Sequence, residues 1–313
     1  MSAGPDTKLT GALRRPRQML ATQEYGGHLS IHDDTIAADL GFSGAPIEGP
    51  THFSQFVPLL HELFGDAWFE RGCLSAHYQG MVVEGEEVRA FAERHGGLAT
   101  ARIGAEKADG TPVLTGTASV GPNHGDTELD QRRVRLRPAD QLVILRDLHV
   151  GQRGAADPER VVMDFDQNMG QLYPFSLNDK LKVITEPHPW YTAEGGPTSP
   201  WGRAIVPLEM ISVLTQYTGG GAGFRARGPA VGLFAAQEIK LIAGPLFVGH
   251  PYEIDREIIA LSESRRTEST WIKSSIYDAA SHDLAAEVIL NSATLKDSYA
   301  NYAADAAALG KTL

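Results

Sequence analysis

The segment between residues 28 and 52 carries the side chains best suited to moving protons. Its candidates, five polar residues and one glycine, are His28, His32, Asp34, Glu48, Gly49 and His52. Histidine changes its charge near neutral pH, so His32 is predicted to be the acid/base group. Asp34 either orients His32 or shares with Asp33 the capping of a short helix expected at residues 35–40.

His28 precedes His32 by four residues. On a helix the two rings would share one face, and Asp34 would complete a two-histidine, one-carboxylate metal set. The flanking composition is not typical of a helix, so we expect no metal ion, and nothing else in the sequence indicates a cofactor.

A second candidate pair lies in the sequence EPHPWY at residues 186–191. Glu186 has the chemistry of a general base, and Tyr191 that of a hydrogen-bond donor. The alternative is that Glu186 is solvated and that Trp190, Tyr191 and Trp201 are aromatic residues of the core or of a pocket wall. Trp190 and Trp201 are therefore candidates for substrate binding, as are Glu48, Gly49 and His52 at the first helix start.

The elements expected to position these groups occur twice in the same order. Apolar residues at spacings of three and four predict a helix over residues 51–64. Strand-like stretches separated by glycine-containing turns follow at residues 72–81, 87–94, 99–108 and 112–120. The second half repeats the pattern with a helix at 205–217 and strands at 231–242, 251–261, 268–278 and 283–294.

Fixed offsets also indicate a duplication. Gly80 and Gly244 are 164 residues apart, as are Gly85 and Gly249. A lone helix must bury its apolar stripe against the sheet that follows it, so each copy is predicted to be an α+β unit. We expect two domains, residues 1–135 and 136–313, joined by the polar stretch 121–137.

Composition narrows the class of protein. The 313 residues are 42% apolar and 21% charged, and the net charge is −11, which disfavours binding to nucleic acid. A single cysteine, no signal-peptide pattern and no apolar run of 18 residues favour a cytoplasmic protein that does not span a membrane. We expect a small-molecule substrate as the partner; the sequence leaves a homodimer open.

Residues 31–52 read IHDDTIAADLGFSGAPIEGPTH, and this segment resembles MaoC-like hydratases, the double hotdog relatives of (R)-specific enoyl-CoA hydratases. The matching residues are Ile31, His32, Asp33, Asp34, Ala38, Gly41, Phe42, Ile47 and Gly49. The resemblance implies a tandem hotdog fold, in which each antiparallel sheet wraps around a central helix. It also implies that backbone N–H groups at the start of that helix stabilise an enolate oxygen, a role that suits a helix N-terminus.

The chain departs from the family pattern at the catalytic pair. The family's aspartate, five residues before the histidine, falls on Gly27, and its Asn-Pro pair falls on Leu29 and Ser30. In the second half, Glu186 takes the aspartate position and Tyr191 takes the histidine position. Neither half carries the complete dyad.

Three functions follow as hypotheses. The first is a hydratase or dehydratase that acts on an enoyl or 3-hydroxyacyl thioester, with CoA as one candidate carrier, by acid/base catalysis and oxyanion stabilisation at the helix start. The second is a lyase, isomerase or cyclase with a rebuilt site for a bulkier substrate without CoA. The third is a non-catalytic binding partner or a thioesterase variant.

Overall fold

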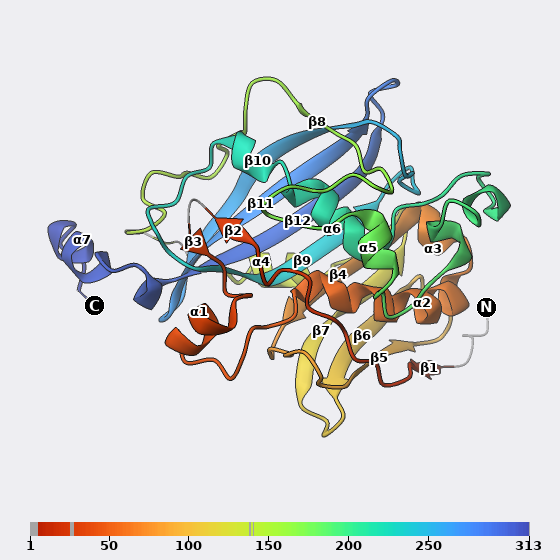
Figure 1. Cartoon of the computed structure of the whole chain (residues 1–313), viewed down its shortest axis with the longest axis horizontal. Coiled ribbons are helices and arrows are strands. Elements are labelled where there is room, and N and C mark those ends of the chain that lie inside the picture. Colours follow the sequence, from red (N-terminus) through yellow and green to blue (C-terminus); the bar gives the residue numbers. More distant parts are fainter. Residues whose placement is uncertain (1–5, 26–27, 138, 140, 313) are drawn as a thin grey trace.

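The computed structural model describes residues 6–25, 28–137, 139 and 141–312. Its main feature is a ten-stranded sheet with the order β1-β5-β6-β7-β4-β9-β12-β11-β10-β8, in which all neighbouring strands are antiparallel. Helices α2, α5 and α6 lie over the same face of this sheet (Figure 1). The architecture is therefore α+β, as predicted.

The first copy consists of a buried helix and the four strands that follow it. The helix begins as the 3-10 segment η1 (Gly49–Phe56) and continues as α2 (Val57–Phe64). Phe53, Phe56 and Leu60 are fully buried, because their spacing places them on the side that faces the sheet. The strands are β4 (Gly72–Tyr78), β5 (Val88–Arg94), β6 (Thr100–Lys107) and β7 (Pro112–Val120).

The second copy has the same order. Its helix is α6 (Leu208–Gln216), in which every residue except the last is buried. The strands are β9 (Gly232–Leu241), β10 (Tyr252–Glu263), β11 (Thr267–Asp278) and β12 (Leu284–Leu295). The predicted helices and the eight predicted strands are confirmed, with shifts of a few residues at their ends.

Equivalent hydrogen bonds support the duplication. The Ile47 N–H donates to the Val82 carbonyl at 2.7 Å, and the Val206 N–H donates to the Leu246 carbonyl at 2.8 Å. Each bond joins two segments of one copy: the residues just before the buried helix and the turn after the first strand.

The two copies join through β4 and β9, which pair edge to edge along residues 73–77 and 236–240. One hydrophobic core runs through both halves, with Phe53 and Leu74 from the first and Ile211 and Ile239 from the second. The pairing leaves only the short strands β1 and β8 at the edges of the sheet. The division into residues 1–135 and 136–313 remains a prediction.

Several short elements are additional to those predicted. They are β1 (Thr7–Thr10), β2 (Glu24–Tyr25), β3 (His28–Leu29), α3 (Ala67–Arg71), α4 (Glu128–Arg133), β8 (Glu159–Val161), α5 (Leu177–Leu181), η2 (Pro189–Tyr191), η3 (Gly196–Thr198), η4 (Gly219–Ala222), η5 (Lys296–Ser298) and α7 (Tyr302–Ala308). The expected connection thus contains a helix, α4. Across the described ranges, no helix has both the length and the apolar character that a bilayer crossing requires.

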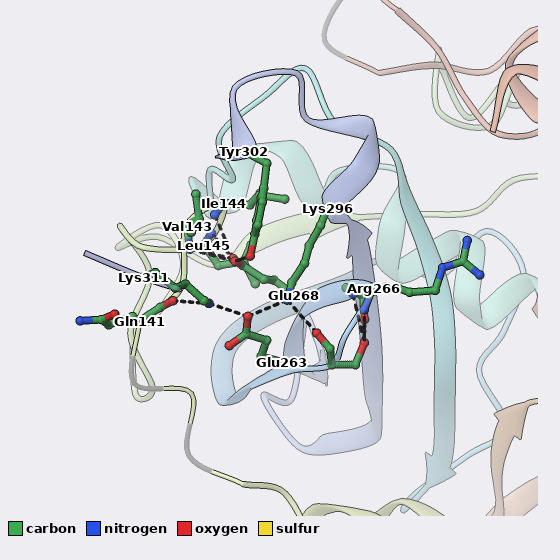
Figure 2. Close-up of polar contacts among 12 residues, drawn as sticks. Gln141, Val143, Ile144, Leu145, Glu263, Arg266, Glu268, Lys296, Tyr302 and Lys311 are labelled. Carbon is green, nitrogen blue, oxygen red and sulfur yellow. Dashed lines mark hydrogen bonds and ion pairs between the residues drawn. The ribbon is translucent and has the colours of Figure 1, made fainter. Parts of the chain in front are cut away.

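A buried carboxylate fastens the C-terminal segment to the second copy. Glu268 on β11 accepts hydrogen bonds from the backbone N–H groups of Val143, Ile144 and Leu145 and from the Tyr302 hydroxyl, at 2.9–3.1 Å (Figure 2). Because this carboxylate is fully buried, the four donors take the place of water around its charge. The contact ties α7 and the segment after the connection to one strand.

Candidate active site

A cavity of about 260 Å³ lies at the start of the first buried helix. Its polar side chains come from the segment that precedes the helix, from the helix itself and from distant strands and loops: Gln23, Ser30, His32, Glu48, His52, Tyr78, Gln79 and Tyr173. The first residues of β9, from Gly232 to Ala235, close it from the second copy. The cavity therefore lies at the seam between the halves.

His32 is held in one tautomer by the chain that leads to the helix. Its Nδ1 lies 2.7 Å from the Pro46 carbonyl oxygen, which can only accept, so Nδ1 carries the proton. Burial lowers the pKa of His32, and the neutral ring keeps an unprotonated Nε2 as a proton acceptor. The Gln18 amide also donates to the Pro46 carbonyl, at 2.6 Å, and so supports the same carbonyl.

Glu48 is the N-cap residue of η1 and is 8% exposed. Burial raises the pKa of this carboxyl from 4.5 to about 7, although the Lys180 ammonium and the hydrogen bond from the Tyr173 hydroxyl oppose the rise. The Tyr173 oxygen lies 3.1 Å from Glu48 Oε1. A carboxyl with this pKa can donate or accept a proton at neutral pH.

A buried ion pair from the second half lies beside these groups. Lys180 on α5 and Glu209 on α6 pair at 2.9 Å, with side chains 4% and 2% exposed. Lys180 also donates to the Thr51 hydroxyl at 3.2 Å, and the Ser54 hydroxyl donates to Glu209 at 2.7 Å. The pair therefore connects α5 and α6 to the first helix.

His52 stands on the helix one turn after Glu48 and is 2% exposed. Burial, with the Lys180 charge as a second cause, lowers the pKa of His52 to about 4, so the ring is neutral at neutral pH. Its Nδ1 is buried and has no hydrogen-bond partner among the described residues. An unpaired acceptor or donor beside a cavity is suited to a ligand.

Gly49 permits a close approach between the helix start and an aromatic ring. A Cβ atom at this position would lie 2.5 Å from Cζ of Tyr78, so only glycine fits against the ring. Pro50 carries no N–H, and the Thr51 N–H donates to the Glu48 carbonyl at 3.1 Å. Within the described chain, the Gly49 N–H is the donor left open at this helix start.

The equivalent place in the second half is closed and apolar. At an offset of 159 residues, Tyr191 stands for His32, Pro207 for Glu48 and Ile211 for His52. Tyr191 and Ile211 border a void of only about 20 Å³ whose lining is otherwise apolar. Burial raises the pKa of Tyr191 far above its usual value, and this ring is part of the core.

Glu186 lies away from the cavity and faces Arg14. The guanidinium group donates from Nε and Nη2 to the two carboxylate oxygens, at 2.6 and 3.1 Å. Glu186 is therefore paired rather than solvated, and its role as a base beside Tyr191 remains a prediction. Trp190 and Trp201 pack edge-to-face against each other and against Phe69, in an aromatic cluster outside the cavity.

The structure also separates Asp34 from His32. Asp33 is the N-cap of α1 (Asp34–Asp39) and accepts from the N–H groups of Thr35 and Ile36, which confirms the capping alternative. Asp34 Oδ1 accepts instead from the Ala45 N–H at 2.9 Å, so it does not orient His32. His28 lies in β3 with its side chain outside the described structure, and the described residues contain no cluster of three or more metal-binding side chains.

The sequence analysis does not identify several residues around the site, among them Gln18, Tyr78, Tyr173 and Lys180. Tyr173 and Lys180 lie 125 and 129 residues from their partners Glu48 and Thr51, so no local pattern joins them. The capping box formed by Ser176 and Asp179 was the one local signal for α5, the helix that carries Lys180.

Comparison with known proteins supports the fold. No protein-family model matches the chain, and no curated protein matches it. Among solved structures, a protein of Chloroflexus aurantiacus described as a MaoC domain dehydratase is 14% identical, with a TM-score of 0.53 over 93% of this chain and 95% of its own. A second protein, described as a MaoC-like dehydratase, is 14% identical with a TM-score of 0.50 over 94% and 98%.

A conserved hypothetical protein of Mycobacterium tuberculosis, described as having a double hotdog fold, is 10% identical with a TM-score of 0.52 over 84% of this chain and 86% of its own. The chain has the double hotdog fold of MaoC-like dehydratases. In this double hotdog, the polar cavity lies at the start of the first copy's helix, and Tyr173, Lys180 and Glu209 support it from the second half of the chain.

Proposed function

We propose that the chain is a hydratase or dehydratase that acts on a conjugated carbonyl compound, with its reaction in the cavity of the first hotdog copy. The observation that carries the proposal is the convergence of three groups at one helix start. They are the neutral His32 ring, the Glu48 carboxyl with a pKa of about 7, and the open Gly49 N–H. The shared fold with MaoC-like dehydratases adds to this support.

The three groups suit the dehydration of a 3-hydroxyacyl compound. His32 Nε2 takes the proton from the α-carbon, and the Gly49 N–H donates to the enolate oxygen that forms. The protonated Glu48 carboxyl donates its proton to the β-hydroxyl group, which leaves as water while the enolate electrons form the double bond. Hydration is the reverse sequence, in which the Glu48 carboxylate takes the proton from water.

Loss of the conjugated absorbance of an enoyl thioester tests this proposal. Purified full-length protein is incubated with a short and a long enoyl-CoA, together with His32→Ala, Glu48→Gln and Tyr191→Phe variants. We expect turnover in the parent protein and in Tyr191→Phe, and a loss of about 100-fold or more in the other two. Equal turnover in all four proteins would place the reaction elsewhere, and binding without turnover would make the chain a binding protein.

The lining of the cavity favours a substrate without CoA as a second candidate. The residues that line it include no lysine and no arginine within the described structure, so no cation there pairs with the phosphates of CoA. This observation favours the rebuilt site considered from the sequence, which takes an uncharged conjugated carbonyl compound.

The carrier is tested by a pair of substrates that share one acyl group. An enoyl thioester of N-acetylcysteamine retains the reacting atoms and lacks the nucleotide and its phosphates. If kcat/KM is at least as high for this compound as for the CoA thioester, the enzyme does not recognise CoA. A kcat/KM that is about 100-fold higher for the CoA thioester would show that residues beyond the cavity bind the nucleotide.

A further inference from the structure

A second hollow lies on the face of the sheet opposite the catalytic cavity. Trp271, Asn291, Ala236 and His77 are direct partners on β11, β12, β9 and β4, so their side chains form one row across four strands. Successive side chains of a strand point to opposite faces, so His77 faces away from the cavity that Tyr78 lines.

His77, Trp271 and Asn291 of this row line a groove of about 470 Å³, which is within the range of roughly 300–1,000 Å³ that is usual for small-molecule sites. Helix α4 forms one wall and is anchored by the Leu129 N–H, which donates to the Ser75 hydroxyl at 3.0 Å. The hairpin between β10 and β11 contributes Ser262 and Thr267 to the other side.

Two buried polar atoms in the groove have no protein partner. Asn291 is 9% exposed, and its Oδ1 has no hydrogen bond within the described structure. His77 Nδ1, also buried, is likewise unpaired among the described residues. A buried unpaired oxygen or nitrogen costs about 1–3 kcal/mol, so a ligand that donates to these atoms removes a penalty.

The groove also carries positive charge that no carboxylate neutralises. Its two carboxylates are already paired: Glu128 with Arg132 at 2.7 Å, and Glu263 with Lys296 and Lys311 (Figure 2). Arg135 and Arg137 line the same groove, and neither has an ion-pair partner in the described part of the chain.

Arg135 and Arg137 are both exposed, so their guanidinium groups are accessible to a ligand. Guanidinium groups bind phosphate and carboxylate through paired hydrogen bonds, so these two arginines are suited to an anionic group. Trp271 lies in the core beneath the groove: it is 2% exposed, and its indole N–H donates to the Ser262 hydroxyl at 3.2 Å.

We infer that this groove is a binding site for an amino-substituted nucleotide such as an adenine nucleotide. The phosphate pairs with Arg135 and Arg137, and the exocyclic amine donates to Asn291 Oδ1. The site is independent of the proposed reaction, because it opens on the opposite face of the sheet.

Isothermal titration of the full chain at low salt tests the inference, with AMP as the first probe. We expect AMP to bind about tenfold more tightly than IMP, which presents a carbonyl oxygen to Asn291 in place of the amine. Ribose 5-phosphate lacks the base and adenosine lacks the phosphate, so each is expected to lose at least as much affinity as IMP. Inorganic phosphate measures binding of the anion alone.

Variants locate the site. Arg135→Gln combined with Arg137→Gln is expected to weaken AMP by at least tenfold, and Asn291→Leu to remove the preference for AMP over IMP. Arg225→Gln, at an exposed arginine outside the groove, is the matched control and leaves binding unchanged. Far-UV circular dichroism and melting temperature confirm that each variant is folded.

Three results would overturn the inference: no heat with millimolar AMP, phosphate binding as tightly as AMP, or unchanged binding in the double arginine variant. Enoyl thioester turnover in the parent protein is measured separately. Absence of turnover would not affect the nucleotide-binding result, and absence of AMP binding would not affect the turnover result.

Discussion

Replacing Glu48 by glutamine tests whether the carboxyl at the helix start titrates near neutral pH. The substitution removes the charge and keeps the shape, and the amide oxygen still accepts from the Tyr173 hydroxyl that now lies 3.1 Å from Glu48 Oε1. The variant therefore separates the effect of ionisation from the effect of packing.

The magnitude follows from the pKa difference between the folded and the unfolded chain. Burial raises the pKa of Glu48 from 4.5 to about 7, so ionising it in the folded protein costs about 3 kcal/mol. Below pH 4.5 the group is protonated in both the folded and the unfolded chain, so its titration does not reduce the free energy of unfolding. As pH rises toward 7 the unfolded chain ionises first, so the free energy of unfolding falls until the folded group ionises as well.

Urea unfolding at pH 5, 6, 7 and 8 measures this effect on the parent protein and Glu48→Gln. The difference between the two proteins cancels the other titrating groups, and we expect the variant to gain about 2–3 kcal/mol relative to the parent between pH 5 and pH 8, because part of the total effect is already present at pH 5. Glu62→Gln, at an exposed glutamate on α2, supplies the baseline. A difference that stays constant from pH 5 to pH 8 would refute the raised pKa and remove Glu48 as a neutral-pH acid.

Two further predictions concern the support of the site. Lys180→Met leaves the Glu209 carboxylate buried without its cation and is expected to lower the free energy of unfolding by about 3–5 kcal/mol. Adding Glu209→Gln is expected to restore much of this loss. Urea unfolding measures both variants, and an unchanged free energy of unfolding in Lys180→Met would contradict the pairing. Gly49→Ala places a Cβ atom 2.5 Å from the Tyr78 ring and is expected to lower the melting temperature and the turnover, whereas Gly220→Ala, which meets no atom within 4 Å, leaves both unchanged. Equal melting temperatures would show that the ring moves aside freely.

The sequence predicts the regular part of the fold because that part depends on local patterns. The apolar spacing of Phe53, Phe56 and Leu60 indicates a helix buried on one side, and the structure confirms it. The edge strands β1 and β8 span four and three residues, too few for an alternation to register. They form because the neighbouring strands β5 and β10 offer free edges, which is a property of the assembled sheet.

The candidate site likewise contains residues that local sequence patterns identify and residues that only the folded chain brings together. Glu48, Gly49 and His52 lie at one helix start, so adjacency in sequence was enough to place them around one cavity together with His32. Glu186 is a candidate because of its position in a repeated motif. Such a motif does not indicate which residue the carboxylate contacts, and the structure pairs it with Arg14. The burial that raises the pKa of Glu48 is a property of the folded chain, which no local sequence pattern shows.

The fusion of the two copies has a consequence for how such a site changes over time. In a dimer of identical chains, every substitution acts at both sites at once. Here the positions equivalent to His32 and His52 are occupied by Tyr191 and Ile211 in the second copy. In a fused chain, one copy can therefore be purely structural while the other copy carries the reactive groups.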